Sequence, residues 1–268
     1  MVISIIGVGV IGSAVAKALI ASGEEESVVA ADKRIDLFFD LEKKGIETTT
    51  NNKKAAEMAD VLILCVKPKD AKTVLTEIRE EIKGKLVLSI VAAINLNTLK
   101  KYAPEARFVR AIPNLAILVR KSFTAYCKGS DVTAKDISTI KKILGTLGFF
   151  IEVEEEKMDA FTSLSGCAPG YLAFIIDALI KGGTEVGIPP EMALTALAHS
   201  IIGTGKLILN AKKTPLEIMK MVATPGGVTE EELKELEKYS LPQAFKSMLQ
   251  VGTKKCRKIL EMLEAEDR

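Results

Sequence analysis

Three glycines near the N-terminus constrain the fold of this 268-residue chain more than any other feature of its sequence. They follow the apolar run Val2–Ile6 directly and open a segment with helical periodicity. In that context Gly7 permits a tight turn, Gly9 lets the backbone approach a pyrophosphate, and Gly12 lets the helix pack closely on the strand. The helix N-terminus would face the phosphates, so a dinucleotide site is predicted here. The predicted loop comprises Gly7, Val8, Gly9, Val10, Ile11 and Gly12.

Short apolar runs alternate with helical patterns as far as residue 153. The runs read VISIIG, SVVAA, VLILCV, LVLSI, RFVRAI, FTAYC and FFIEV. Such alternation is typical of an α/β fold with a doubly wound, mostly parallel sheet of the Rossmann type. After Glu154–Glu156 no strand-like run remains, and the chain becomes helical. We therefore predict a dinucleotide-binding domain over residues 1–155 and an all-helical domain over residues 156–268.

The helical half contains segments that are apolar on nearly every side. Residues 171–180 and 192–209 have this pattern, and the last helix repeats apolar residues at helical spacing. A helix that is apolar all round needs burial all round, and so few residues of helix cannot easily supply that burial alone. The pattern favours a homodimer, or a larger assembly of dimers, built from the helical domains. A compact monomer with an unusually apolar core is the alternative.

Charge and cysteine usage narrow the classes of partner. Lys and Arg total 37 against 35 Asp and Glu, so there is no broad field to attract nucleic acid or an anionic membrane. The four cysteines are far apart and the chain has one histidine, which argues against disulfides and a metal site. The apolar N-terminus lacks a basic region and meets Lys17 before it reaches the length of a membrane span. The sequence predicts a soluble cytoplasmic protein with a small-molecule substrate.

The end of the second predicted strand bears on which dinucleotide is bound. Asp32 stands there, 20 residues beyond Gly12. A carboxylate at this place would accept hydrogen bonds from the adenosine ribose and repel a 2′-phosphate, which favours NADH slightly over NADPH. Lys33 and Arg34 follow at once and could instead hold that phosphate, or form a solvated turn.

A Pro-Gly-Gly turn runs directly into a predicted helix start in the stretch VATPGGVTEEEL. Thr229, followed three residues later by Glu232, fits a capping box. Gly226 and Gly227 leave the preceding backbone bare, so the amides at the helix start could approach a small anion such as a carboxylate. A capped helix after a turn, without any ligand, is the plainer interpretation.

Stretches along nearly the whole chain resemble the pyrroline-5-carboxylate reductase family. In the second half they are EVEEE (152–156), LSGCAPGY (164–171), IIDALIKGGTEVGIP (175–189) and TPGGVT (224–229). In the first half they are CVKP (65–68), SIVAAI (89–94) and VRAIPN (109–114). The resemblance implies reduction of L-Δ1-pyrroline-5-carboxylate to L-proline, the last step of proline biosynthesis, by hydride transfer from NADH or NADPH to the imine carbon.

The same resemblance implies roles for particular residues. The Pro-Gly-Gly turn would hold the substrate carboxylate, with the Thr229 hydroxyl adding a hydrogen bond. Glu155 would favour the iminium form of the substrate, unless it belongs to a solvated acidic linker. The implied substrate-binding residues are Gly226, Gly227, Val228 and Thr229, and the implied cofactor-binding residues beyond the glycine loop are Asn52, Val66, Lys67, Pro68, Ala93 and Asn114.

Several alternatives stay open at this level. The motif LSGCAPGY has Cys167 and Ala168 where the family commonly has Ser and Gly, and hydride transfer to an imine needs no thiol nucleophile. A β-hydroxyacid reductase would need a lysine donor on the long helix, and none precedes Lys181 there. A reductase of another cyclic imino acid, such as the six-membered homologue, and a catalytically silent nucleotide-binding sensor dimer both remain.

Overall fold

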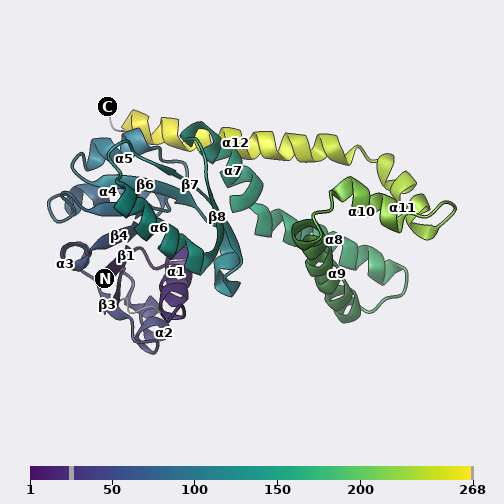
Figure 1. Cartoon of the computed structure of the whole chain (residues 1–268), viewed down its shortest axis with the longest axis horizontal. Helices are drawn as coiled ribbons and strands as arrows, with labels where there is room; N and C mark the ends of the chain where they lie inside the picture. Colours follow the sequence, from purple (N-terminus) through teal and green to yellow (C-terminus); the bar gives the residue numbers. More distant parts are fainter. Residues whose placement is uncertain (24–26, 267–268) are drawn as a thin grey trace. The chain divides into compact units, whose positions relative to one another are not determined.

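The computed structural model describes residues 1–23 and 27–266, and its chain forms two compact units (Figure 1). Unit 1 comprises Met1–Pro169 together with Val251–Arg268, and unit 2 comprises Gly170–Gln250. The predicted division at residue 155 follows the end of the strand-like sequence, whereas the compact units divide at Pro169 and the last helix ends in unit 1.

Unit 1 is built on an eight-stranded sheet with the order β3-β2-β1-β4-β5-β6-β7-β8. Its strands are β1 (Val2–Ile6), β2 (Ser27–Ala31), β3 (Glu47–Thr49), β4 (Val61–Leu64), β5 (Leu86–Ser89), β6 (Arg107–Ile112), β7 (Ser122–Lys128) and β8 (Gly148–Glu152). All neighbours pair in parallel except β6 and β7, which confirms the prediction of a mostly parallel sheet. β3 is not among the strands predicted from the sequence.

Helices cover both faces of this sheet (Figure 1). Those on one face are α1 (Val10–Ile20), α2 (Phe39–Glu42) and α6 (Ala134–Leu147), and those on the other are α3 (Asn52–Met58), α4 (Pro68–Glu77) and α5 (Leu96–Tyr102). Each face encloses its own cluster of buried apolar side chains. The central strands are therefore apolar on both sides, as expected for a covered parallel sheet.

The strand order reverses direction between β1 and β4. From β1 the chain adds β2 and β3 on one side, then crosses back to place β4 and β5 on the other. Connections leave the carboxyl ends of β1 and β4 in opposite directions, and a crevice opens between them, where α/β sheets usually bind ligands. The glycine loop follows β1, so the topology alone places it at this point.

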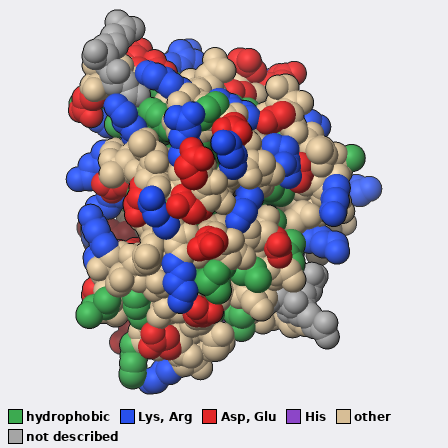
Figure 2. All heavy atoms as spheres, turned by 90° about the vertical axis from the view of Figure 1, so that its left-hand side faces the viewer, with side chains coloured by type: hydrophobic (Ala, Val, Ile, Leu, Met, Phe, Trp, Pro, Cys, Tyr) green, Lys and Arg blue, Asp and Glu red, His purple; other side chains and the backbone are tan. Residues whose placement is uncertain are grey.

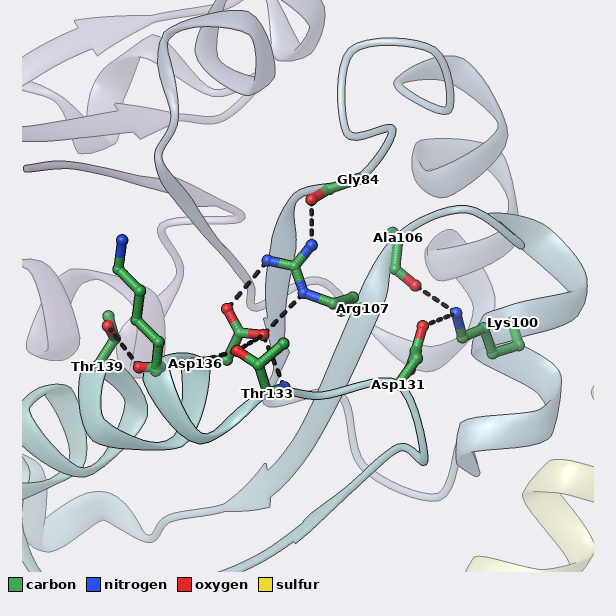
Figure 3. A network of polar contacts seen from close by, with 9 residues as sticks. Gly84, Lys100, Ala106, Arg107, Asp131, Thr133, Asp136 and Thr139 are labelled. Carbon is green, nitrogen blue, oxygen red and sulfur yellow. Dashed lines mark hydrogen bonds and ion pairs between the residues drawn. The ribbon is translucent and has the colours of Figure 1, made fainter.

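A charged network anchors the opposite, amino end of β6 (Figure 3). Arg107, at the start of β6, donates to both carboxylate oxygens of Asp136, at 2.8 and 3.0 Å, and also to the Gly84 carbonyl. Asp136 and Thr133 form a capping box at the start of α6. These hydrogen bonds lower the pKa of Asp136 to about 2, the contribution of Arg107 being the largest. The network therefore fixes α6 to the sheet through an ionised carboxylate.

The chain between β8 and the long helices is irregular. It contains η3 (Glu155–Lys157), α7 (Met158–Phe161) and a π-helical turn, η4 (Thr162–Gly166), before α8 (Ala168–Glu185). Pro169 is the second residue of α8, where its missing N–H costs little. The distortion of the helical path is the π turn that precedes it. The remaining 3-10 turns are η1 (Ile35–Leu37) and η2 (Leu115–Val119).

Unit 2 is helical, as predicted. It contains most of α8, then α9 (Pro190–Asn210), α10 (Pro215–Val222), α11 (Val228–Glu237) and the beginning of α12 (Leu241–Glu266). Large apolar side chains are exposed along α8 and α9, among them Phe174 at 74% and Leu209 at 79%. By length and composition alone, Glu155–Glu185 and Pro190–Asn210 would suffice to cross a membrane. Among the described residues of one chain, these apolar side chains stay largely exposed.

Charged side chains of both signs are interspersed over the face of the molecule seen in Figure 2. No single-sign field dominates that face, in keeping with the near balance of 37 basic and 35 acidic residues in the chain. Such a surface gives no broad electrostatic attraction for a polyanion.

Candidate active site

Two of the three loop glycines are required by close packing. A side chain at Gly7, whose φ is 92°, would stand 2.8 Å from the backbone carbonyl of Cys65 at the end of β4. A side chain at Gly12 would stand 2.0 Å from the Gly7 carbonyl oxygen, where no atom fits. These two positions therefore let β1, the loop and α1 fit together, as the sequence pattern predicts.

Gly9 is bare for a different reason. A Cβ there would meet only the Arg34 guanidinium, whose Nη2 lies 3.7 Å away. Gly9 is also the N-cap of α1 and, having no side chain, supplies no capping acceptor to the amides that begin the helix. The packing of the protein thus leaves both space and helix amides at this point, which is the arrangement that a pyrophosphate needs.

The loop borders a cavity of about 490 Å³ in unit 1. Several of the predicted cofactor residues line this cavity, together with Lys33 and Arg34, which follow β2. Its lining includes Gly7, Gly9, Asp32, Lys33, Arg34, Asn52, Cys65, Val66, Lys67, Lys69, Asp70 and Glu77. Burial raises the pKa of the Cys65 thiol to about 12, so that thiol stays protonated and chemically quiet.

Asp32 is already engaged by the backbone around it. One carboxylate oxygen accepts the Val8 N–H of the glycine loop at 3.0 Å, and the other accepts the Arg34 N–H at 3.0 Å. The Arg34 Nε lies 3.5 Å from the second oxygen, and the Asp32 side chain is 11% exposed. The carboxylate therefore braces the loop, a role that the sequence analysis did not foresee. The exposed Arg34 partly offsets its charge.

Asn52, predicted on the adenosine side, and Lys67 and Pro68, predicted on the nicotinamide side, lie at helix starts. Asn52 is the first residue of α3, and its side-chain amide donates to Glu77 at the end of α4, at 2.9 Å. Lys67 is the N-cap of α4 and Pro68 its first residue. Asn52, Val66 and Lys67 border the cavity, so the geometry is compatible with the contacts that the resemblance implies.

Ala93 and Asn114 follow the carboxyl ends of β5 and β6. Ala93 is buried and has a φ of 66°, a left-handed conformation that non-glycine residues rarely adopt. The buried Asn114 caps η2 by accepting the Ala116 N–H at 3.0 Å. Its side-chain amide donates to the Ser165 carbonyl in the π turn, also at 3.0 Å. The π turn thus fixes the orientation of Asn114, which the sequence pattern did not reveal.

Glu155 has structural partners. Its Oε1 accepts the Leu96 N–H at the start of α5, at 2.6 Å, and lies 3.6 Å from Nη1 of the buried Arg110. Asp159 pairs with the same guanidinium at 3.1 Å. Glu155 lines a second cavity, beside β8, and is not among the residues that line the cavity at the glycine loop. Its carboxylate therefore serves first to neutralise Arg110 and to cap α5.

In unit 2, the residues Thr224–Gly227 form a tight turn. The Gly227 N–H donates to the Thr224 carbonyl at 2.8 Å, and Gly226 has a φ of 71°. A type II turn requires a positive φ at its third position, which Gly226 supplies, and commonly has proline at its second, as here. A side chain at Gly227 would stand 2.5 Å from the Thr224 hydroxyl, so this glycine is required as well.

The predicted capping box at Thr229 is wrong. Helix α11 begins at Val228 with Gly227 as its N-cap, which places Thr229 inside the first turn, and the structure gives no capping hydrogen bond from a side chain there. With Thr229 inside the helix, the Glu232 N–H that a capping box would satisfy falls within the regular helical hydrogen-bonding pattern and needs no side-chain acceptor. Instead, Glu230 turns back and accepts the Gly226 N–H at 2.9 Å. The amides of Val228 and Thr229 remain at the head of the helix.

Two family models match separate stretches of the chain. A family model described as pyrroline-5-carboxylate reductase dimerisation matches residues 155–259. A second, described as NADP oxidoreductase coenzyme F420-dependent, matches residues 2–93. A pyrroline-5-carboxylate reductase of Methanosarcina acetivorans is 34% identical over 248 residues, which cover 91% of this chain and 92% of the relative. The chain belongs to the pyrroline-5-carboxylate reductase family.

Relatives in that family extend to animals and to solved structures. Pyrroline-5-carboxylate reductase 2 of Bos taurus is 29% identical over 99% of this chain and 86% of its own length. The crystal structure of the Plasmodium falciparum pyrroline carboxylate reductase with NADP bound is similar, with a TM-score of 0.87 and 25% identity over 96% of this chain and 97% of that one. The structure of a pyrroline-5-carboxylate reductase from Coxiella burnetii has a TM-score of 0.88 and 27% identity, over 96% of this chain and 97% of that one.

Proposed function

We propose that this protein is a pyrroline-5-carboxylate reductase, which transfers a hydride from NAD(P)H to the imine carbon of L-Δ1-pyrroline-5-carboxylate and so forms L-proline. The observation that carries the proposal is that one chain of this family combines the two sites that the reaction needs. The glycine loop and its cavity suit a dinucleotide, and the turn Thr224–Gly227 with α11 suits a small carboxylate. The match over nearly the full length of family members supports it.

The chemical demand on the protein is modest. The bound nicotinamide supplies the hydride, and a protonated imine accepts it readily once the two carbons are close. The chain must therefore position and desolvate the reactants more than it must activate them. No side chain need act as a nucleophile, in keeping with the high pKa of the Cys65 thiol.

The turn would hold the substrate through its carboxylate. Because the turn itself uses the Gly227 N–H, the donors for a substrate would be the amides of Val228 and Thr229 at the head of α11 and, once Glu230 has left it, the Gly226 amide. The half-buried Thr229 side chain can add its hydroxyl. Val228 would act through its backbone alone, since its side chain is 77% exposed. Thr229 is thus the one substrate contact whose side chain can be tested by substitution.

Glu155 is a weaker candidate for a role in the chemistry. Its position beside Arg110 and the α5 amide favours an indirect part, in which it keeps the segment after β8 in place. A direct role for Glu155 near the substrate nitrogen stays a prediction. If Glu155 acts only indirectly, Glu155→Gln should alter folding stability more than the pH dependence of turnover.

For the cofactor we propose NADPH as the better donor. The lean toward NADH depends on a free Asp32, and this carboxylate is engaged by the glycine loop and by Arg34. Arg34 and Lys33 line the same cavity, and an arginine after the second strand is a known partner for a 2′-phosphate. Arg34→Ala should raise the KM for NADPH well above tenfold while changing the KM for NADH by less than about threefold.

The assembly and location follow from the same assignment. The dimerisation match indicates a homo-oligomer, and we propose a homodimer, or a larger assembly of dimers, through the apolar faces of α8 and α9. We propose a cytoplasmic location, in keeping with a soluble substrate and cofactor.

Oxidation of NADPH and of NADH, followed separately with pyrroline-5-carboxylate as acceptor, tests the assignment. Turnover with the wild type and a large loss of kcat/KM in Thr229→Ala would support both the reaction and the substrate turn. Turnover only with a six-membered cyclic imine would favour the related imino acid reductase. If no imine is reduced although NADPH binds, the protein is better explained as a catalytically silent nucleotide-binding sensor.

A further inference from the structure

The substrate turn already holds a carboxylate, which belongs to the protein itself. Glu230 Oε2 accepts the Gly226 N–H at 2.9 Å, so one of the three amides assigned above to the substrate is occupied from within the same helix. The backbone N–H of Gly226 is the main cause that lowers the pKa of Glu230, which therefore stays ionised at neutral pH. A free anion would meet this carboxylate at the turn.

Lys234 holds Glu230 in this arrangement. Its ammonium lies 3.5 Å from Glu230 Oε2 and 2.7 Å from Glu231 Oε1. The two glutamates are neighbours in the first turn of α11 and share this lysine, but the turn amide is bonded only to Glu230 among the described contacts. The Glu230 side chain is 38% exposed and that of Glu231 is 69% exposed, so Glu230 is the one drawn in toward the turn.

We propose that Glu230 occupies the substrate turn, lowers the affinity of the turn for carboxylates and must be displaced by the carboxylate of the incoming substrate. This role rests on the proposed function. A ligand that competes with an internal occupant binds with an apparent affinity reduced by the fraction of time that the site is free. Glu230 therefore lowers the apparent affinity of the turn for every anion. A small anion that contacts the turn alone has no other interaction to offset this loss.

Two matched variants separate this role from a general effect of charge. Glu230→Ala and Glu231→Ala each remove one negative charge from the same helix turn, and only the first frees the Gly226 amide. For Glu230→Ala we expect a KM for pyrroline-5-carboxylate that is about three- to tenfold lower, with an unchanged kcat. For Glu231→Ala we expect a KM within about twofold of the wild type, because its carboxylate makes no contact with the turn.

Inhibition by inorganic phosphate gives a second readout. With the turn free of its internal carboxylate, phosphate should inhibit Glu230→Ala at a several-fold lower concentration than it inhibits the wild type or Glu231→Ala. Far-ultraviolet circular dichroism would confirm that each variant keeps the helix content of the wild type.

Two results would overturn the role of Glu230. A raised KM or a lowered kcat in Glu230→Ala would mean that Glu230 assists the substrate, and equal KM changes in both variants would mean that only net charge matters. If the wild type does not reduce pyrroline-5-carboxylate, the proposed function fails, and this role with it. Turnover by the wild type with an unchanged KM in Glu230→Ala refutes the competition alone.

Discussion

Replacing Asp32 should weaken both nicotinamide cofactors alike. In the structure its carboxylate accepts the Val8 N–H of the glycine loop and the Arg34 N–H, each at 3.0 Å. Asp32→Ala removes both acceptors and leaves the loop to find its cofactor-binding shape without them. If Asp32 instead accepts a hydrogen bond from the adenosine ribose, the same substitution should weaken the binding of NADH and leave that of NADPH unchanged or stronger.

The structure sets the size of the effect. A hydrogen bond to a charged group contributes about 1.5 to 3 kcal/mol, and the acceptor of the Val8 bond is only 11% exposed. Because the loop must be ordered before the pyrophosphate binds, the lost bond appears as lost affinity. Taking the lower value, the Kd of each cofactor should rise about tenfold.

The assay is a direct titration of NADH and NADPH, followed by nicotinamide fluorescence, with wild type, Asp32→Ala and a control. Asp36→Ala is a suitable control, because it removes the same charge from an exposed position in η1 outside the cavity. It should change neither Kd by more than about twofold. The bracing role is refuted if Asp32→Ala loses affinity for NADH and binds NADPH as tightly as the wild type does.

Three further predictions concern packing, pH and assembly. Gly12→Ala places a carbon 2.0 Å from the Gly7 carbonyl oxygen, so we expect denaturant titration to show a loss of about 1 to 3 kcal/mol and cofactor binding to fall with it. The pKa of Asp136 is lowered from 3.8 to about 2 in the folded protein, so its contribution to the free energy of unfolding is full above about pH 4 and is lost as the pH falls through 2. In denaturation curves, Asp136→Asn should therefore lower the free energy of unfolding by about 2 kcal/mol at pH 7 and by little at pH 2. Phe174→Glu charges a side chain that is 74% exposed in one chain, and light scattering should show a smaller assembly if α8 lies in the interface.

The sheet was predictable because its central strands are continuous apolar runs. β3 was not predicted because Glu47–Thr49 is only three residues long and polar. Its parallel pairing with β2, and not its composition, identifies it as a strand. The π turn at Thr162–Gly166 was also missed, because a single wider turn leaves no periodic signal in so short a segment. Tertiary pairing, not local propensity, decides such elements.

The candidate site shows where sequence reasoning ends. The three loop glycines could be assigned roles because each role depends on backbone space, and Gly7 and Gly12 prove to be packed tightly. Side-chain partners could not be assigned in the same way. A carboxylate at Asp32 suits a ribose hydroxyl or a backbone amide equally well until the loop is placed next to it. Likewise, Thr229 fits a capping box by spacing, but the preceding turn ends at Gly227 and makes that glycine the cap.

The exposed apolar helices of unit 2 are better explained by a protein partner than by a lipid bilayer. The stretch that includes α8 passes a test of length and mean hydropathy for a membrane span. It also carries Asp177 and Lys181, which pair at 2.6 Å within α8 and are 59% and 73% exposed. Charged side chains within a span are costly and rarely face lipid. At the margin of a protein interface the same pair stays hydrated at little cost, and the dimerisation match covers this helix. The apolar surface and the ion pair are therefore compatible if the partner is a second copy of the chain.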